Sequence, residues 1–206
     1  MAPVRLCVLV SGSGTILQAM IDSGLDVTLV VSDRPCRGLD LAREAGITAL
    51  LVDREKLGGF AKSFEREAYT GELTRLLVED RIDLVAMAGF GTIVTGTFHL
   101  AFPGRVLNTH PSLLPAFKGW HAVATTLAAG ATESGCTVHV ATEELDDGPI
   151  LAQRRVAVLA DDDESSLHER IKTVERSLYP EVVARVMASM AAGNEPASVA
   201  GTMEES

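Results

Sequence analysis

The sequence lacks a surplus of basic residues, paired cysteines and long apolar runs, and each absence argues against a class of protein. Its 206 residues include 18 Lys and Arg against 28 Asp and Glu, which gives a net charge of −10. Nucleic acid is an unfavourable partner for such a chain, because phosphate binding needs stripes of Lys and Arg. Cys7, Cys36 and Cys136 are odd in number and far apart, which argues against both a disulfide framework and a zinc site.

The apolar stretches are short. Residues 4–10 are too few to cross a bilayer and run directly into a Gly-rich turn, so we interpret them as a strand and not as a signal peptide. We therefore expect a soluble, cytoplasmic protein with no membrane contact. Hydrophobic residues make up 47% of the chain, which argues against disorder.

Short β-branched runs alternate with longer helical stretches. The expected strands are residues 4–10, 27–31, 49–52, 82–88, 105–110, 136–141 and 150–158. The expected helices are residues 17–21, 38–45, 64–79, 123–129 and 165–190, the last with a kink at Pro180. This order predicts an α/β fold with a doubly wound, mostly parallel, Rossmann-like sheet, a C-terminal β-hairpin and a long final helix.

We expect a single domain over residues 1–192, with a first half up to about residue 105 and a second half over residues 106–192. The composition turns small and polar after Ala192, so residues 193–206 are predicted to form a disordered tail. In a doubly wound sheet, ligands bind at the carboxyl ends of the strands. The motifs that could carry chemistry all follow such ends.

The turn after the first strand is Ser11-Gly12-Ser13-Gly14-Thr15. Glycine permits a tight turn, and the following helix N-terminus offers free N–H groups with partial positive charge, which suits a phosphate. The turn matches neither GxGxxG nor a loop that ends in Gly-Lys-Ser/Thr. By itself it predicts either a phosphate site or an ordinary turn.

Asn108 and His110 are two residues apart at the end of an expected strand, so their side chains project to the same side. An amide N–H₂ can bind a developing oxyanion, and an imidazole can move a proton or lend positive charge, which suits acyl transfer. The alternative is a structural histidine bonded to a nearby carbonyl. We interpret His139 as a histidine of the core or as a support for a neighbouring group.

Four carboxylates between Glu143 and Asp147 precede a Gly-Pro turn. Such a cluster is usually the solvated tip of a hairpin, but a carboxylate that faced His110 would orient the ring and favour its charged form. Metal binding is a third alternative. We expect no metal, because there is no second ligand cluster and the spacing is not that of an EF-hand.

These clusters, in this order, resemble the phosphoribosylglycinamide formyltransferase family, the folate-dependent glycinamide ribonucleotide transformylases. The resemblance covers about residues 4–180 and implies a formyltransferase fold whose first half binds phosphate and whose second half is catalytic and binds folate. It rests on the segments SGSGTILQA (11–19), LNTHPSLLPAF (107–117), GCTVHV (135–140), LDDGPILAQ (145–153) and ERSLYP (175–180).

The resemblance implies direct transfer of a formyl group from the co-substrate 10-formyltetrahydrofolate to the amine of 5'-phosphoribosylglycinamide, in de novo purine (IMP) biosynthesis. Asn108 matches the asparagine that binds the oxyanion, and His110 matches the catalytic histidine. Asp146 matches the aspartate that keeps this histidine charged and helps to shuttle protons through water. The implied partners are these two small molecules, and a homodimer is kept open.

The resemblance also implies binding residues. Main-chain N–H groups of Gly14, Thr15 and Ile16 would hold the substrate phosphate, and Glu175 would contact the glycinamide ribonucleotide. The formyl-folate would be contacted by Arg66 and by the run Gly91, Thr92, Ile93 and Val94. Because both ligands are anionic, the acidic chain must bind them through local donors, for which we expect the loop amides, Arg66 and Lys118.

The chain departs from the family pattern at several positions. Ile16 replaces an expected Asn, so a side-chain contact to the phosphate is lost. Gly91-Thr92 stands where the family usually has Met-Arg, which should reshape the folate pocket. Lys118 replaces a Pro, and Asp147 replaces a Gly beside the catalytic aspartate.

Three alternatives stay open. The first is a formyltetrahydrofolate deformylase, in which water replaces the amine; that family has an additional N-terminal regulatory domain, which we do not expect here because the first strand begins at Val4. The second is transfer to another amine, such as an amino sugar nucleotide. The third is a degenerate nucleotide-binding module without catalysis, which the presence of Asn108, His110 and Asp146 argues against.

Overall fold

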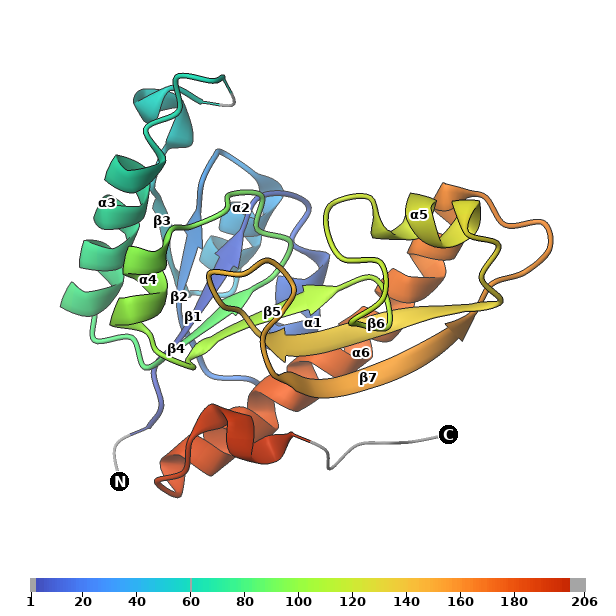
Figure 1. Ribbon diagram of the computed structural model, residues 1–206. Coiled ribbons are helices and arrows are strands. Elements are labelled where there is room, and N and C mark those ends of the chain that lie inside the picture. The colour runs from blue at the N-terminus through green and yellow to red at the C-terminus, as the bar shows by residue number, and fades with distance from the viewer. Residues whose placement is uncertain (1–2, 60, 201–206) are drawn as a thin grey trace. The chain divides into compact units, whose positions relative to one another are not determined.

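The computed structural model describes residues 3–59 and 61–200 (Figure 1). The chain divides into two compact units, of which the first ends at Val106 and the second begins at Leu107.

The first unit is built on a parallel sheet. Its strands are β1 (Leu6–Val10), β2 (Val27–Ser32), β3 (Thr48–Leu51) and β4 (Leu84–Met87), in the spatial order β3-β2-β1-β4. Every residue of the central strand β1 is buried. A continuously apolar strand is what a parallel sheet covered on both faces requires.

Five helical segments connect these strands or follow them: α1 (Thr15–Asp22), α2 (Arg37–Glu44), the 3₁₀ helix η1 (Arg54–Leu57), α3 (Arg66–Glu79) and α4 (Gly96–Ala101). The chain moves outward from β1 to β3, and α3 then returns it to β4 on the other side of β1. Because crossovers are right-handed, this reversal places α1 and α2 on one face and α3 on the other. Figure 1 shows α3 and α4 side by side. The reversal creates a topological switch point at the carboxyl ends of β1 and β4, where ligands bind in such sheets.

The second unit is antiparallel. Its strands β5 (Val106–His110), β6 (Glu133–Val140) and β7 (Ile150–Ala157) pair in sequence order. The helix α5 (Ala122–Ala128) lies between β5 and β6 in the chain, and α6 (Glu164–Ala191) packs against β6 and β7. The buried hydroxyl of Tyr179 on α6 donates to the carbonyl of Leu107 at 2.8 Å, which joins the helix to β5.

The predicted fold class is confirmed: a parallel, doubly wound sheet, a C-terminal hairpin and a long last helix are all present. Details differ from the expectation. The segments η1 and α4 were not expected. The last helix, α6, is one long helix with Pro180 inside it, as expected. The strand β6 begins at Glu133 and not at residue 136, because Glu133 still pairs with Ala157 and accepts from Arg155 at 2.6 Å.

Residues 193–200 differ from the disordered tail that we expected. They include the 3₁₀ helix η2 (Pro196–Val199), which packs on α6 and buries Pro196. The N–H of Asn194 donates to the carbonyl of Ser189 at 3.0 Å, so the chain folds back on the end of α6. The rest of the expected tail, residues 201–206, lies outside the described residues. Within the described part of the chain, no helix combines the length and hydropathy needed to cross a membrane.

Candidate functional site

The strand β5 presents different side chains on its two faces. Asn108 and His110 lie on one face, and Thr109 lies on the other, as the two-residue period of a strand requires. The hydroxyl of Thr109 donates to the carboxylate of Glu175 on α6. The structure therefore brings Asn108 and His110 together and places Glu175 against the opposite face of the strand.

His110 is held between two acceptors. Its side chain is buried, with Nδ1 at 3.3 Å from Oδ2 of Asp146 and Nε2 at 2.8 Å from the carbonyl oxygen of Phe117. Neither a carboxylate nor a carbonyl can donate, so the surroundings suit a ring that carries hydrogens on both nitrogens. Of the alternatives for the acidic turn, the geometry fits a carboxylate that faces His110, and this carboxylate belongs to Asp146.

The inward direction of Asp146 depends on its backbone. The residue has φ of 54°, in the left-handed region, and is 7% exposed, whereas its neighbours Leu145 and Asp147 are exposed. Its Oδ2 also accepts the N–H of Gly119 at 2.9 Å. The N–H of Gly119 and the imidazole of His110 together fix the orientation of this buried carboxylate.

His139 joins this cluster, and its position was not identified from the sequence beyond a core or supporting role. It lies opposite Asn108 in the pairing of β5 with β6, with Nε2 at 3.4 Å from Nδ2 of Asn108. Burial lowers the pKa of His139, although the Val140 carbonyl and Asp146 oppose this change. A neutral ring that donates from Nδ1 to the Val140 carbonyl, at 3.1 Å, can accept at Nε2 and so orient the amide of Asn108.

In the first unit, the turn after β1 leads into α1 through Gly14. This glycine has φ of 73°, and a Cβ on it would lie 2.8 Å from Cα of Gly38. No side chain caps the start of α1, which leaves the N–H groups of its first turn for another acceptor. Thr15 is exposed and the side chain of Ile16 is buried, so Ile16 offers only its main chain there.

The loop after β4 is tied to the ends of β1 and β2. The N–H of Gly91 donates to Oγ of Ser11 at 2.6 Å. The buried hydroxyl of Thr92 donates to Asp33 at 2.7 Å and accepts from Nη1 of Arg54 at 2.9 Å. The Gly91-Thr92 departure thus has a structural role, since Thr92 bridges a carboxylate and a guanidinium. Of the next two residues, Ile93 is exposed and Val94 is buried.

Three arginines gather around this loop. Arg34 binds Asp33 through two nitrogens, each at 2.9 Å, and its Nη2 would lie 2.8 Å from a Cβ on Gly91. Burial lowers the pKa of Arg54, and the charges of Arg34 and Arg66 lower it further while Asp33 opposes them. Burial alone would raise the pKa of Asp33, but hydrogen bonds from Arg34, Thr92 and Ser11 outweigh it and hold the pKa below its usual value. The result is a local excess of positive charge that includes the expected residue Arg66.

Arg34 and Arg54 were missed by sequence reasoning. The available signal was the position of Arg34, three residues after the end of a predicted strand, where functional side chains gather. Arg54 follows the third strand, but its approach to Thr92 depends on a contact between residues 38 positions apart.

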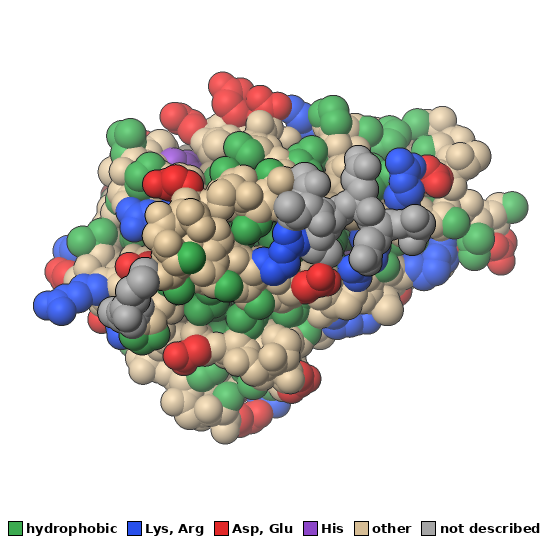
Figure 2. All heavy atoms as spheres, turned by 90° about the horizontal axis from the view of Figure 1, so that it is seen from below, with side chains coloured by type: hydrophobic (Ala, Val, Ile, Leu, Met, Phe, Trp, Pro, Cys, Tyr) green, Lys and Arg blue, Asp and Glu red, His purple; other side chains and the backbone are tan. Residues whose placement is uncertain are grey.

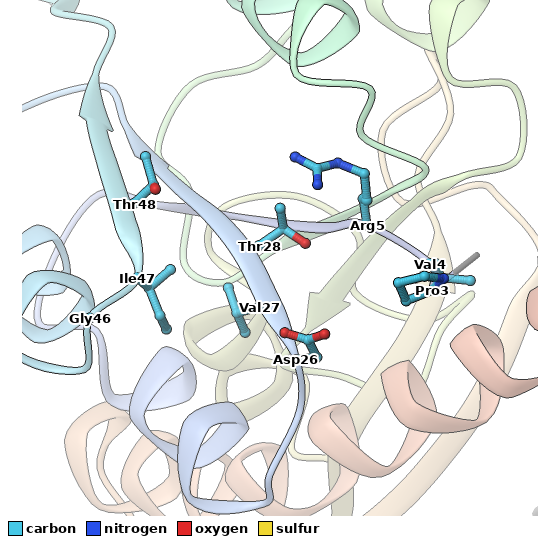
Figure 3. Close-up of a pocket in the computed structure, with 9 residues that line it drawn as sticks. All are labelled: Pro3, Val4, Arg5, Asp26, Val27, Thr28, Gly46, Ile47 and Thr48. Carbon is cyan, nitrogen blue, oxygen red and sulfur yellow. The ribbon is translucent and has the colours of Figure 1, made fainter.

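A separate cavity of about 430 Å³ lies at the other end of this sheet (Figure 3). Its walls come from the first residues of β2 and β3 and from the segments that precede β1, β2 and β3, including Arg5, Asp26 and Thr48. These are the amino ends of the strands, whereas ligands of doubly wound sheets bind at the carboxyl ends. We therefore do not assign the cavity to the reaction. Among the described residues, no group of three or more His, Cys, Asp or Glu side chains is arranged to hold a metal ion.

Residues 4–183 match the sequence pattern of a known protein family, the formyl transferases. The chain is 43% identical over 188 residues to phosphoribosylglycinamide formyltransferase of Mycobacterium tuberculosis, covering 89% of this chain and 85% of that protein. It is 41% identical over 192 residues to the trifunctional purine biosynthetic protein adenosine-3 of Drosophila melanogaster, covering 89% of this chain but only 14% of that longer protein.

Among solved structures, glycinamide ribonucleotide transformylase 1 of Symbiobacterium toebii matches with a TM-score of 0.79 and 40% identity, over 87% of this chain and 85% of that one. The family description and these similarities cover both units. The chain belongs to the formyl transferase family.

Proposed function

We propose that this chain transfers a formyl group from 10-formyltetrahydrofolate to the amine of 5'-phosphoribosylglycinamide, a step of de novo purine biosynthesis. The observation that carries the proposal is the cluster of the half-buried Asn108 with the buried His110 and Asp146, in a chain 43% identical to a phosphoribosylglycinamide formyltransferase. Asn108 and His110 supply two hydrogen-bond donors on one face of β5, and the carboxylate of Asp146 lies next to Nδ1 of His110.

In the proposed reaction, the substrate amine attacks the formyl carbon and the formyl oxygen becomes an oxyanion. The amide N–H of Asn108 and an N–H of His110 donate to this oxygen, and Asp146 holds the ring from its other nitrogen. The amine loses one proton as the leaving folate nitrogen gains one, so no side chain is consumed. His139 orients the amide of Asn108 by accepting one of its hydrogens.

The first unit supplies the proposed binding contacts. The open N–H groups of Gly14, Thr15 and Ile16 suit the substrate phosphate. The positive cluster near Thr92, formed by Arg34, Arg54 and Arg66, suits the carboxylates of the folate. For Glu175, a contact with the glycinamide ribonucleotide is part of the proposal, supported by its position beside Thr109 on β5.

A cytoplasmic location and a homodimer complete the proposal. The free cysteines support a reducing compartment. Val78 and Leu100, exposed apolar side chains on the adjacent helices α3 and α4, are a surface that a second copy could cover. Light scattering after size-exclusion chromatography tests the dimer.

The reaction is tested with purified protein, glycinamide ribonucleotide and 10-formyltetrahydrofolate, by following the folate product by absorbance. Asn108→Ala and His110→Ala should each lower kcat by about 10²–10³-fold, because each removes a donor to the oxyanion. Unchanged melting temperatures would show that the variants stay folded. Turnover near that of the wild type in either variant would remove that residue from the mechanism.

Controls separate the alternatives. Formate release without glycinamide ribonucleotide would identify a deformylase. Turnover with another phosphorylated or nucleotide-linked amine, but none with glycinamide ribonucleotide, would show that the chain transfers the formyl group to a different acceptor.

A further inference from the structure

Lys118 and Asp147, two residues at which the chain differs from the family pattern, are in contact with each other. The ammonium of Lys118 donates to the carboxylate of Asp147, although the residues are 29 positions apart. The side chain of Asp147 therefore points toward Lys118, and the additional negative charge beside Asp146 is matched by a positive one. In this structure the ammonium of Lys118 is directed to Asp147, whereas the sequence predicts it as a local donor for anionic ligands.

The ion pair joins the loop that connects β5 to α5, which carries Lys118, to the turn between β6 and β7, which carries Asp147. The two halves of the loop between β5 and α5 are held differently. The first half is anchored in the interior: the N–H of Leu114 donates to Oγ1 of Thr137 at 3.1 Å, and its carbonyl accepts from Gln153 at 2.8 Å. In the second half, the contacts of residues 117–119 lead to His110 or to the turn that carries Asp146, and the carbonyl of His121 accepts from Thr125 on α5.

One of these contacts conflicts with the proposed chemistry. Nδ1 of His110 faces Asp146, so Nε2 is the nitrogen left to serve the formyl oxygen. Nε2 already donates to the carbonyl of Phe117 at 2.8 Å. That carbonyl and an oxyanion compete for one hydrogen, and the loop must release His110 before the hydrogen bond to the oxyanion can form.

We propose that the Lys118–Asp147 ion pair is a latch that keeps the Phe117 carbonyl on His110 in the ligand-free protein and opens when substrates bind. The inference rests on the proposed function, because it assigns Nε2 of His110 to the formyl oxygen. Lys118 and Asp147 act as positioning residues that do not touch substrate. Their side chains are 37% and 55% exposed, and an exposed ion pair limits the effect of its loss to about fivefold.

Amide hydrogen exchange in the ligand-free protein tests the latch, and this measurement does not require enzymatic turnover. The N–H of Gly119 is bonded to Asp146, in the residue next to Lys118. Lys118→Gln and Asp147→Asn should each speed its exchange by up to about fivefold, and the double variant should add little. The matched control is Glu133→Gln, which breaks the exposed ion pair between Glu133 and Arg155 on the hairpin. Exchange at Gly119 equal to that of the control would overturn the proposal.

Kinetics and fluorescence then test release on binding. Trp120, the single tryptophan of the chain, is 66% exposed and two residues from Lys118, so its emission reports on this loop. Both single variants should show a KM for 10-formyltetrahydrofolate up to about fivefold lower, with kcat retained, and a Trp120 response at correspondingly lower concentrations of tetrahydrofolate. A tenfold or larger fall in kcat, or single effects that add in full in the double variant, would overturn the latch. Absence of turnover in the wild type would refute the proposed function alone, since the exchange experiment needs no turnover.

Discussion

Glu175 is a half-buried carboxylate whose surroundings oppose its charge. Burial raises the pKa of Glu175, and the hydrogen bond from Thr109 and the charges of Lys172 and Arg176 offset only part of this effect. A carboxyl with a raised pKa binds its proton more tightly in the folded chain than in the unfolded one. The contribution of Glu175 to the stability of the fold is therefore lost as the pH rises above 4.5, the ordinary pKa of a glutamate. A charge kept at such a position is typical of a residue retained for function.

Glu175→Gln should accordingly raise the melting temperature at pH 7, because it removes the buried charge and keeps an oxygen for Thr109. The gain should shrink as the pH falls toward 4.5, where the wild-type carboxyl takes up its proton. The control is Glu169→Gln on the same helix. A hydrogen bond from Lys172 lowers the pKa of Glu169, so that variant should lose stability or stay level. A lower melting temperature for Glu175→Gln at pH 7 would contradict the argument.

How far the site could be predicted depends on whether the relation between residues is local. The common face of Asn108 and His110 follows from a spacing of two in a strand, and the sequence suffices for it. The inward direction of Asp146 depends on a left-handed backbone and on Gly119, 27 residues away in the sequence. The contact between Asn108 and His139 depends on the register of two strands. Neither the direction of Asp146 nor the contact between Asn108 and His139 can be inferred from the residues next to them in the sequence.

At the scale of elements, the start of α6 shows how polar residues outside the site contribute. Asp163 accepts the N–H of Ser166 at 2.8 Å, and the hydroxyl of Ser166 accepts the N–H of Asp163 at 3.0 Å. Such a reciprocal capping box satisfies two backbone donors that the helix cannot. Asp163 of the acidic run therefore has a structural role, as the N-cap of the helix that carries Glu175 and Tyr179.

Asp163→Ala should lower the free energy of unfolding by about 1 kcal/mol, or roughly 2–4 °C in melting temperature for a chain of this size. Urea denaturation measures the change. Asp161→Ala is the matched control, because Asp161 is exposed in the same acidic run and is not the N-cap. Asp163 lies outside the proposed reaction, so kcat and KM should remain those of the wild type. Equal stability of the two variants would exclude the cap as a contributor.

Elements with a strong apolar period were predictable, and short ones were not. The buried strands β1 and β4 and the helix α3 follow from runs and spacing of Val, Leu and Ile. In contrast, η1 and α4 have four and six residues, too few for a helical period to be recognised. The handedness of crossovers, a general rule, fixes the face of the sheet on which each connecting helix lies, but it does not fix the order of the strands in space.

At the scale of the whole molecule, the net charge of −10 must be reconciled with two anionic ligands. Figure 2 shows acidic, basic and apolar side chains intermingled over one face of the protein. Net charge acts over about a Debye length, about 10 Å at 0.1 M salt, whereas a guanidinium that touches a carboxylate acts at contact. The arginines near Thr92 can thus bind an anion despite the overall charge.

Arg66→Gln tests this balance. Loss of the guanidinium should raise the KM for 10-formyltetrahydrofolate about tenfold with kcat unchanged, because a hydrogen bond to a charged group contributes about 1.5–3 kcal/mol. The effect should be larger at 10 mM than at 200 mM salt, since the Debye length shortens from about 30 Å to under 10 Å. Arg75→Gln is the control: it removes the same charge from α3 at a residue paired with Glu79. If both variants change KM alike, net charge and not local contact governs binding. A rise in KM confined to Arg66→Gln places the folate carboxylates at the positive cluster.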